Sequence, residues 1–293
     1  MAWDVKGMKS LTAVFLNLAN VLVILFLTVP LLALVFASVQ TERTLIGHYM
    51  DIIPRELTSV NFEVIMGRPV PAMWSIPKAI IAFPRAFGNS LIVATSVTLL
   101  TLVFASLMAY AVARLRVRWT QTMMYVNLAT RLVPIIILMV PLFVTLRRLQ
   151  LLNTLPGIIV TEVGFLLPYA VWILVAYFLS LPGELEDAAR IDGCTRMGCL
   201  LRIVLPLSAP GLAATAVIVF LISWNELLIP LIVTSKQEMM TVPVLLSTLV
   251  SDFHVYYTLM AAISLVGLLP SAVLALLLQK YVVRGLTAGA LKG

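Results

Sequence analysis

The fold is decided by residues 157–206, where GIIVTEVGFLLPYAVWILVAYFL occupies 157–179 and, after Ser180, LPGELEDAARIDGCTRMGCLLRIVLP occupies 181–206. The first part has one charged side chain, Glu162, in 23 residues, and the second part has seven in 26 residues. A helix needs about 20 apolar residues to cross the hydrocarbon core of a bilayer. The stretch therefore predicts a membrane-spanning helix followed by a polar segment at the membrane surface.

The composition of the whole chain points the same way. Of the 293 residues, 61% are apolar and only 11% are charged, whereas about a quarter are charged in a soluble domain. This excludes a water-soluble globular protein, and the apolar content excludes a disordered chain. The net charge of +7 would favour nucleic acid in a soluble protein, but membrane proteins carry excess Lys and Arg in cytoplasmic loops. We therefore expect a membrane lipid environment and no nucleic-acid partner.

Six stretches are long and apolar enough to span a membrane, which predicts an all-α integral membrane protein with six transmembrane helices. They cover about 14–39, 87–113, 122–146, 157–179, 210–233 and 257–279. The first exceeds the 7–15 residues of a signal-peptide core, so we expect it to stay uncleaved. In the second, Ala105, Ala109 and Ala113 recur every four residues, a pattern that lets two helices pack closely.

The basic residues near the ends of these stretches set the orientation. Their bias is modest and places both termini in the cytoplasm. The resulting organisation is a cytoplasmic N-terminus at 1–13, a six-helix membrane domain at 14–283 and a cytoplasmic C-terminal tail at 284–293. Within the domain, a long outside loop covers about 40–85 and a cytoplasmic loop covers about 180–206.

The cytoplasmic loop predicts two short helices joined by a turn. Pro182 suits the first turn of a helix, and Glu186 is one of three acidic residues placed near its positive end. Gly193 can adopt a left-handed conformation and end this helix. Thr195 is a candidate N-cap for a second helix, which Pro206 would bound. Such a hairpin is either a docking element for another protein or an interfacial linker, and its physical properties favour neither.

The chain contains no recognisable catalytic, metal or nucleotide site. Cys194 and Cys199 have neither a C-x-x-C nor a zinc spacing, and the two histidines, His48 and His254, are far away in sequence. The G-x-x-x-x-G-K-[ST] phosphate loop does not occur. We therefore expect no bound cofactor and no enzymatic activity in this chain.

The hairpin resembles the EAA loop of ABC-importer permeases, which reads Glu-Ala-Ala, three residues, Gly, nine residues and Ile-x-Leu-Pro. This sequence has Asp187-Ala188-Ala189, Gly193 and Ile203-Val204-Leu205-Pro206 at that spacing, with Asp187 in place of Glu. Nearly the whole chain is similar to the second, MalG-like permease subunit of carbohydrate importers, the branch of the maltose transporter. The further segments that carry this resemblance are 109–115 (AYAVARL), 151–154 (LLNT), 223–226 (SWNE), 241–243 (TVP) and 284–293 (RGLTAGALKG).

The resemblance implies the type I importer fold and a set of partners. These are a second, MalF-like permease subunit, a dimer of cytoplasmic ABC ATPase subunits that hold ATP and Mg, and an extracytoplasmic substrate-binding protein. It also implies the cytoplasmic membrane of a bacterium or archaeon. The loop would be the coupling helix that docks on the ATPase. Its residues are Glu186, Asp187, Ala188, Ala189, Asp192, Gly193, Ile203, Leu205 and Pro206. By the same resemblance, Gly289 and Lys292 of the tail would reach the ATPase interface.

Ionisable residues inside spans are costly and mark candidate functional positions. Arg131 lies near a span end and is equally explained by snorkelling, and Glu162 is also explained by an interfacial position. Trp224, Asn225 and Glu226 combine an aromatic ring with hydroxyl-binding groups, which is typical of a sugar path. The competing explanation is a structural hydrogen-bond cluster.

Three functions remain to be separated. The first is a permease for a di- or oligosaccharide, for which a polyol or a glycerol phosphate is the alternative substrate. The second is an ion-coupled secondary transporter, which would usually show an internal repeat and paired intramembrane carboxylates. The third is a channel or scaffold subunit, which would not require the EAA spacing. Dependence of uptake on a separate ATPase separates the first from the others.

Overall fold

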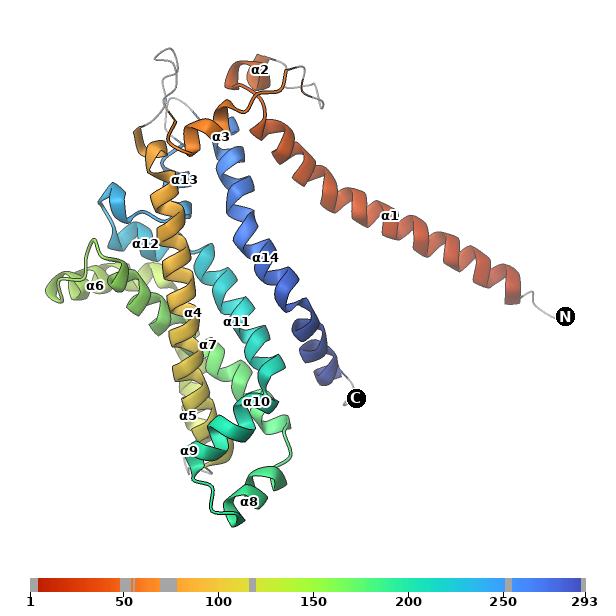
Figure 1. Ribbon diagram of the computed structural model, residues 1–293, viewed down its shortest axis with the longest axis vertical. Coiled ribbons are helices and arrows are strands. Elements are labelled where there is room, and N and C mark those ends of the chain that lie inside the picture. Colours follow the sequence, from red (N-terminus) through yellow and green to blue (C-terminus); the bar gives the residue numbers. More distant parts are fainter. Residues whose placement is uncertain are drawn as a thin grey trace. The chain divides into compact units, whose positions relative to one another are not determined.

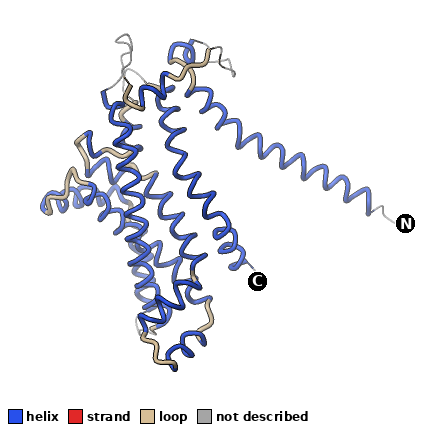
Figure 2. Tube along the Cα trace, viewed as in Figure 1, coloured by secondary structure: helices blue, strands red, loops and turns tan. Residues whose placement is uncertain are grey.

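A computed structural model describes residues 5–47, 54, 56–68, 78–115, 120–250 and 255–290. These residues form helices joined by turns, with one isolated bridge between Val250 and Val255 and no β-strand in the described part (Figure 2). The α-helices are α1 (Val5–Ser38), α2 (Glu42–Gly47), α3 (Val60–Ile65), α4 (Phe83–Arg114), α5 (Thr120–Ala129), α6 (Ile135–Arg148), α7 (Leu155–Ser180), α8 (Glu184–Ile191), α9 (Arg196–Cys199), α10 (Leu205–Leu207), α11 (Ala209–Trp224), α12 (Leu228–Val233), α13 (Val242–Ser247) and α14 (Tyr257–Ala290). The remaining turns are the 3₁₀ helices η1 (Lys78–Ala82), η2 (Thr130–Leu132) and η4 (Gln237–Met239) and the π-helical η3 (Leu200–Val204).

The chain divides into two compact units. The first comprises residues 1–81 and 249–266, and polar side chains close its helix ends. The buried Asn61 amide donates to the carbonyls of Ser38 at 2.9 Å and Gln40 at 2.7 Å, at the end of α1. The Glu42 carboxylate accepts from the backbone amide and the hydroxyl of Thr258, at the start of α14. These contacts satisfy backbone groups that a helix end leaves unpaired.

The second unit comprises residues 82–248 and 267–293 and contains the main apolar core. Its α4 packs most extensively on α7, and α11 packs on both (Figure 1). Ala105 and Ala109 of α4 are completely buried in this core, and Ala113 is partly buried against it. The predicted small-residue face is therefore confirmed as a helix–helix contact.

Four helices are long and apolar enough to cross a membrane, among the residues that the structure describes: Val14–Ser38, Ile80–Arg114, Leu155–Ser180 and Tyr257–Gln279. They correspond to the first, second, fourth and sixth predicted spans. Residues 196–207 and 209–224 form a further pair that passes together but bends by 78°. The structure therefore gives four or five spans by length and composition, and not six continuous ones.

The prediction of one continuous helix over 122–146 is wrong. Helix α5 ends at Ala129, the turn η2 follows, and α6 starts at Ile135. Between them, Val133 and Pro134 are extended, with ψ angles of 115° and 132°. Proline has no amide hydrogen to continue a helix, and it disfavours the helical conformation in the residue before it. The 10 residues of α5 and the 14 of α6 are each shorter than a span.

The fifth predicted span, over 210–233, is also divided. Helix α11 ends at Trp224, and α12 begins at Leu228. The Glu226 Oε1 atom accepts hydrogen bonds from the amides of Leu228 at 2.9 Å and Ile229 at 3.2 Å. The side chain of Glu226 thus closes the start of α12, which explains why a new helix begins here.

The sixth span continues past its predicted end. Helix α14 runs as far as Ala290, so no change of secondary structure marks the boundary predicted after residue 283. Gly289 lies in its last turn, whereas Lys292 lies outside the described residues. The contact proposed for the tail stays a prediction.

Gly157 provides a test of the packing at the start of α7. A Cβ atom at this position would lie 2.2 Å from the carbonyl oxygen of Leu151, which is a backbone atom and cannot move aside cheaply. We expect Gly157→Ala to destabilise the protein by about 1–3 kcal/mol. The matched control is Gly164→Ala on the same helix, where a Cβ would meet nothing within 4 Å. The control should retain or slightly raise stability, because alanine favours helix more than glycine does.

The measurement is the fraction of detergent-purified protein that stays monodisperse after heating, followed by size-exclusion chromatography over a temperature series. A lower midpoint for Gly157→Ala than for Gly164→Ala is expected. Equal midpoints would show that the close approach of Gly157 to Leu151 does not contribute to the stability of the protein.

Candidate functional site

The predicted hairpin is present at one end of the second unit (Figure 1). Helix α8 covers Glu184–Ile191, two residues later than Pro182 predicted. Gly193 follows it with a φ angle of +85°, which confirms the left-handed turn. The Thr195 side chain accepts a hydrogen bond from the amide of Gly198 at 3.1 Å, which confirms its role as the N-cap of α9.

The second helix of the hairpin does not end at Pro206, and this expectation is wrong. After α9 the chain enters the π-helical turn η3, in which the Leu205 amide donates to the carbonyl of Leu200, five residues back. The short helix α10 then includes Pro206. A wider turn relieves the clash of a proline ring with the preceding helical carbonyls. Ile203, Leu205 and Pro206 thus lie in the joint that leads into the 78° bend before α11.

Glu186 is held inward by two residues of α4. It is 7% exposed, and its Oε2 atom accepts a hydrogen bond of 2.9 Å from the hydroxyl of Tyr110. Its Oε1 atom lies 2.8 Å from Nε of Arg114, which makes an ion pair. Hydrogen bonds to charged groups contribute about 1.5–3 kcal/mol each. The hairpin is therefore fixed to the end of α4 by a buried carboxylate.

The same arginine also closes the end of α7. Its Nη2 atom donates to the carbonyl of Phe178 at 2.8 Å and to that of Leu181 at 2.9 Å. Sequence reasoning placed Tyr110 and Arg114 in a segment typical of the permeases but did not foresee that they bind Glu186. The available signal was the first basic residue after a long apolar stretch, Arg114, at the end of the helix where the polar loop also lies.

The opposite face of α8 is exposed. Asp187, Ala188 and Asp192 are open to solvent, and Ala189 is half-buried. Ile191 is 87% exposed, which is unusual for a side chain of its size outside a membrane or an interface. A short helix with a small residue, a large apolar residue and acidic neighbours has the features of a surface that docks on another protein.

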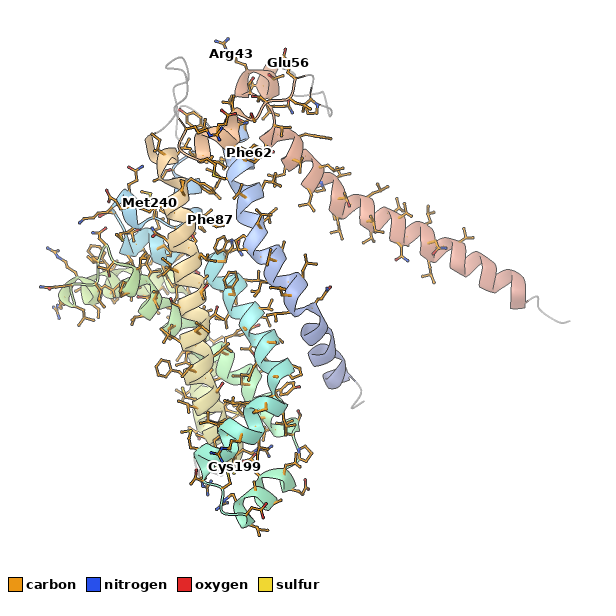
Figure 3. All side chains as sticks on the ribbon, viewed as in Figure 1. Arg43, Glu56, Phe62, Phe87, Cys199 and Met240 are labelled. Carbon is orange, nitrogen blue, oxygen red and sulfur yellow. The ribbon has the colours of Figure 1, made fainter. Side chains whose placement is uncertain are left out.

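The other end of the second unit carries a loop that is anchored at both sides. Asn153 Oδ1 accepts from the amides of Ser235 at 2.7 Å and Lys236 at 3.0 Å. Asn89 of α4 donates to the carbonyl of Met240 at 3.0 Å. Figure 3 labels Phe87 and Met240 near this end of α4 and Cys199 near the other. The anchored loop and the hairpin therefore lie at opposite ends of the unit.

Two of the residues predicted for a substrate path make structural contacts. Trp224 is 5% exposed, and its indole N–H donates to the carbonyl of Gly267 at 3.0 Å. Its ring stacks on Phe220 and meets Phe87 edge-on, with centroids 5.8 and 5.6 Å apart. The Asn225 amide donates to the carbonyl of Leu221 at 2.7 Å. These contacts hold the end of α11 in place.

Glu226, the third residue predicted for the substrate path, lines a cavity together with a second carboxylate. Glu226 shares the lining of a cavity of about 290 Å³ with Glu162 of α7 and Ser223 of α11. Glu162 is 1% exposed, and its Oε2 atom accepts a hydrogen bond from the hydroxyl of Ser223. Glu162 is therefore enclosed between α7 and α11, and its depth in the membrane stays a prediction. The side chain of Arg131 is outside the described part of the structure.

The described residues contain no group of three or more His, Cys, Asp or Glu side chains that could hold a metal ion. Cys194 and Cys199 are free thiols, half-buried and buried respectively. The exposed face of the hairpin is suited to docking a protein, and the carboxylates of the cavity can accept hydrogen bonds.

Comparison with known proteins identifies the family. Residues 101–288 match the family described as binding-protein-dependent transport system inner membrane component. The chain is 33% identical over 285 residues to the trehalose/maltose transport system permease protein MalG of Thermococcus litoralis, covering 97% of this chain and 98% of that one. It is 36% identical to the arabinooligosaccharides permease AraQ of Halalkalibacterium halodurans, over 90% of this chain and 91% of that one. The sulfoquinovosyl glycerol permease SmoH of Agrobacterium fabrum is 34% identical, over 90% and 88%.

A solved structure shares the fold. It belongs to a bacterial ABC transporter that imports the acidic polysaccharide alginate, with a TM-score of 0.74 at 19% identity, covering 96% of this chain and 99% of that one. The predicted all-helical permease architecture is thereby confirmed at the level of the fold. The chain belongs to the family of binding-protein-dependent transport system inner membrane components, the permeases of ABC importers.

Proposed function

We propose that this chain is one of two permease subunits of an ATP-driven importer for a di- or oligosaccharide. The observation that carries the proposal is the hairpin, in which Glu186 is anchored to α4 while Asp187 and Ala188 face outward. That surface docks on a dimer of cytoplasmic ABC ATPase subunits, which bind ATP and Mg²⁺. A second, MalF-like permease subunit completes the translocation pathway.

In this mechanism the hairpin transmits movement from the ATPase subunits to the membrane helices. Closure of the ATPase dimer around ATP displaces α8, and Arg114 passes the displacement to α4 and to the end of α7. The π-helical turn and the 78° bend pass it to α11. Coupling between distant sites needs an element with two discrete positions that both sites bias. The permease would alternate between states open to the cytoplasm and to the exterior.

The proposed role of the hairpin also implies an orientation in the membrane. With α8 in the cytoplasm, the loop anchored by Asn153 and Asn89 faces the exterior and meets the substrate-binding protein. Both termini are then cytoplasmic, and α5 with α6 acts as one broken span, which completes six. The end of α14, including Gly289, and the following Lys292 reach the ATPase interface.

The substrate class is supported by the relatives. Those named above are permeases for trehalose and maltose, for arabinooligosaccharides and for a sulfoquinovosyl glycerol. A polyol or glycerol phosphate importer is the alternative, and a ligand screen of the cognate binding protein separates the two. Uptake that persists without the ATPase would instead favour an ion-coupled secondary transporter. The contact of Trp224 and Asn225 with substrate stays a prediction.

Ala188→Asp tests the docking surface. A charge at this exposed position should be desolvated in the interface, so we expect sugar-stimulated ATPase activity to fall by at least about tenfold, while membrane insertion is unchanged. The control is Ala188→Ser, which adds a small neutral group and should retain most of the activity. The measurement is ATP hydrolysis by the reconstituted complex with its binding protein and sugar. Normal stimulation in the Ala188→Asp complex would contradict the assignment of α8.

Glu186→Gln tests the anchor separately from the docking surface. The amide keeps a contact with Tyr110 but loses the ion pair with Arg114, so α8 should still bind the ATPase but transmit its movement less well. We expect the ATPase subunits to co-purify normally, and the number of sugars imported per ATP to fall about threefold to tenfold, because the ion pair that joins α8 to α4 is lost. Asp187→Asn, on the outward face, should instead weaken co-purification. Identical effects of the two variants would refute the division between an anchoring and a docking carboxylate.

A further inference from the structure

The cavity beside Glu162 lies where two membrane helices are interrupted. Its walls come from the extended segment at Pro134, from Glu162 and Phe165 of α7, and from Ser223, Glu226 and Ile229 at the junction of α11 and α12. Non-helical backbone is tolerated at membrane depth only where it is buried in protein or lines a water-filled cavity. Two interruptions that face one cavity indicate a place where a ligand is bound or passed.

Glu162 has an unused acceptor at this place. Its Oε2 atom is occupied by the Ser223 hydroxyl, but its buried Oε1 atom has no hydrogen-bond partner among the described residues. Glu226 uses one carboxylate oxygen to close α12. A buried polar atom without a partner costs free energy, and ionisable groups inside a membrane are retained for function. The unpaired oxygen therefore points to a ligand that donates a hydrogen bond.

The lining restricts the chemistry of that ligand. Among the described residues that line the cavity there is no Lys, Arg or His, so this lining offers no cation to compensate a phosphate, sulfonate or carboxylate. The described residues also lack a cluster that could hold a metal ion. Ionised carboxylates accept hydrogen bonds, so a ligand with O–H or N–H donors suits them. Phe165 and the aliphatic walls suit the C–H faces of a ring, because sugar-binding sites pair such surfaces with a few polar groups.

The volume of the cavity agrees with a ligand of one sugar ring. A volume of about 290 Å³ lies at the lower end of the range for small-molecule pockets, about 300–1,000 Å³. It is several times the roughly 30 Å³ that one water occupies in the liquid. The cavity is therefore too large for a dedicated ion site and too small for a whole oligosaccharide.

We propose that this cavity is a subsite of the permease for one uncharged, hydroxyl-rich sugar ring, held by the carboxylates of Glu162 and Glu226 and by the hydroxyl of Ser223. The proposal rests on the sugar-importer function and deepens it: this subunit contacts the sugar itself and disfavours anionic substrates such as glycerol phosphates or uronates. The ring would pass through the cavity one residue at a time as the permease changes state.

The test uses the complete complex with its binding protein in proteoliposomes. The probes are radiolabelled trehalose and maltotriose as neutral sugars, and glycerol 3-phosphate and a glucuronic-acid disaccharide as anions. For the wild type, we expect uptake of at least one neutral sugar and of neither anion. Glu162→Ala should raise the KM for the neutral sugar about tenfold or more, because a charged hydrogen bond is lost. Glu162→Gln should have a smaller effect, because it retains the shape and a bond to Ser223.

The matched control is Thr161→Val on the same helix. Its hydroxyl is buried and bonds to the carbonyl of Gly157, and it does not line this cavity, so its KM should stay within about twofold of the wild type. A second measurement is free of the binding protein: 50 mM sugar should raise the thermal midpoint of the detergent-solubilised wild-type complex, since a bound ligand stabilises the folded state. The midpoint of Glu162→Gln should rise less.

The outcomes distinguish a sugar subsite from the alternative explanations of the cavity. In one outcome, Ser223→Ala and both Glu162 variants lower the maximal rate of uptake equally, leave KM unchanged and keep the full thermal shift with sugar. Glu162 would then be only a structural contact between α7 and α11, and the proposal fails. If the wild type imports an anion and Glu162→Ala leaves its KM unchanged, the importer function stands and the subsite fails. If no sugar that the binding protein binds is imported with the ATPase present, the proposed function itself fails and the subsite with it.

Discussion

The contacts of Arg114 organise the polar end of the helical bundle. The last carbonyls of a helix have no partner within the helix, so other groups must satisfy them. Arg114 binds two such carbonyls at the end of α7 and pairs with Glu186 of α8. One side chain therefore joins α4, α7 and α8, and the hairpin cannot shift without moving the two helices on which the core is built. The outward position of Asp187 follows from this, since adjacent residues of a helix point about 100° apart.

The interruptions of the helices are the second organising feature. Pro134 separates α5 from α6, and Glu226 starts α12 after the break that follows Trp224. Each break alone would leave backbone groups unpaired in an apolar environment. In this protein, side chains close some of these groups, and the remaining space is lined by the carboxylate of Glu162. Buried polar groups are thereby concentrated at the cavity for which we propose the sugar subsite.

Much of the fold was predictable, and the reasons are local. A run of apolar residues sets the cost of exposure to water, so the spans of α4, α7 and α14 followed from composition and length. The turn at Gly193 and the cap at Thr195 were also predictable, because each depends on the conformational preference of one residue. The break at Pro134 was not predicted, although proline inside an apolar stretch is a local signal. The hydropathy of the stretch outweighed it, and only the backbone revealed two short helices.

The sites were predictable only in part, because a site is a meeting of distant segments. The sequence by itself determined the membrane setting, the polar hairpin, its spacing of Asp187 to Pro206 and the family resemblance, since all of these are properties of composition and order along the chain. Only the tertiary structure decided that Glu186 is buried against Tyr110, that Trp224 bonds to Gly267, and that Glu162 and Glu226 share one cavity. The physical reason is that the environment of a charged side chain depends on which helices pack around it, and neither its neighbours in sequence nor its helical period specifies that packing.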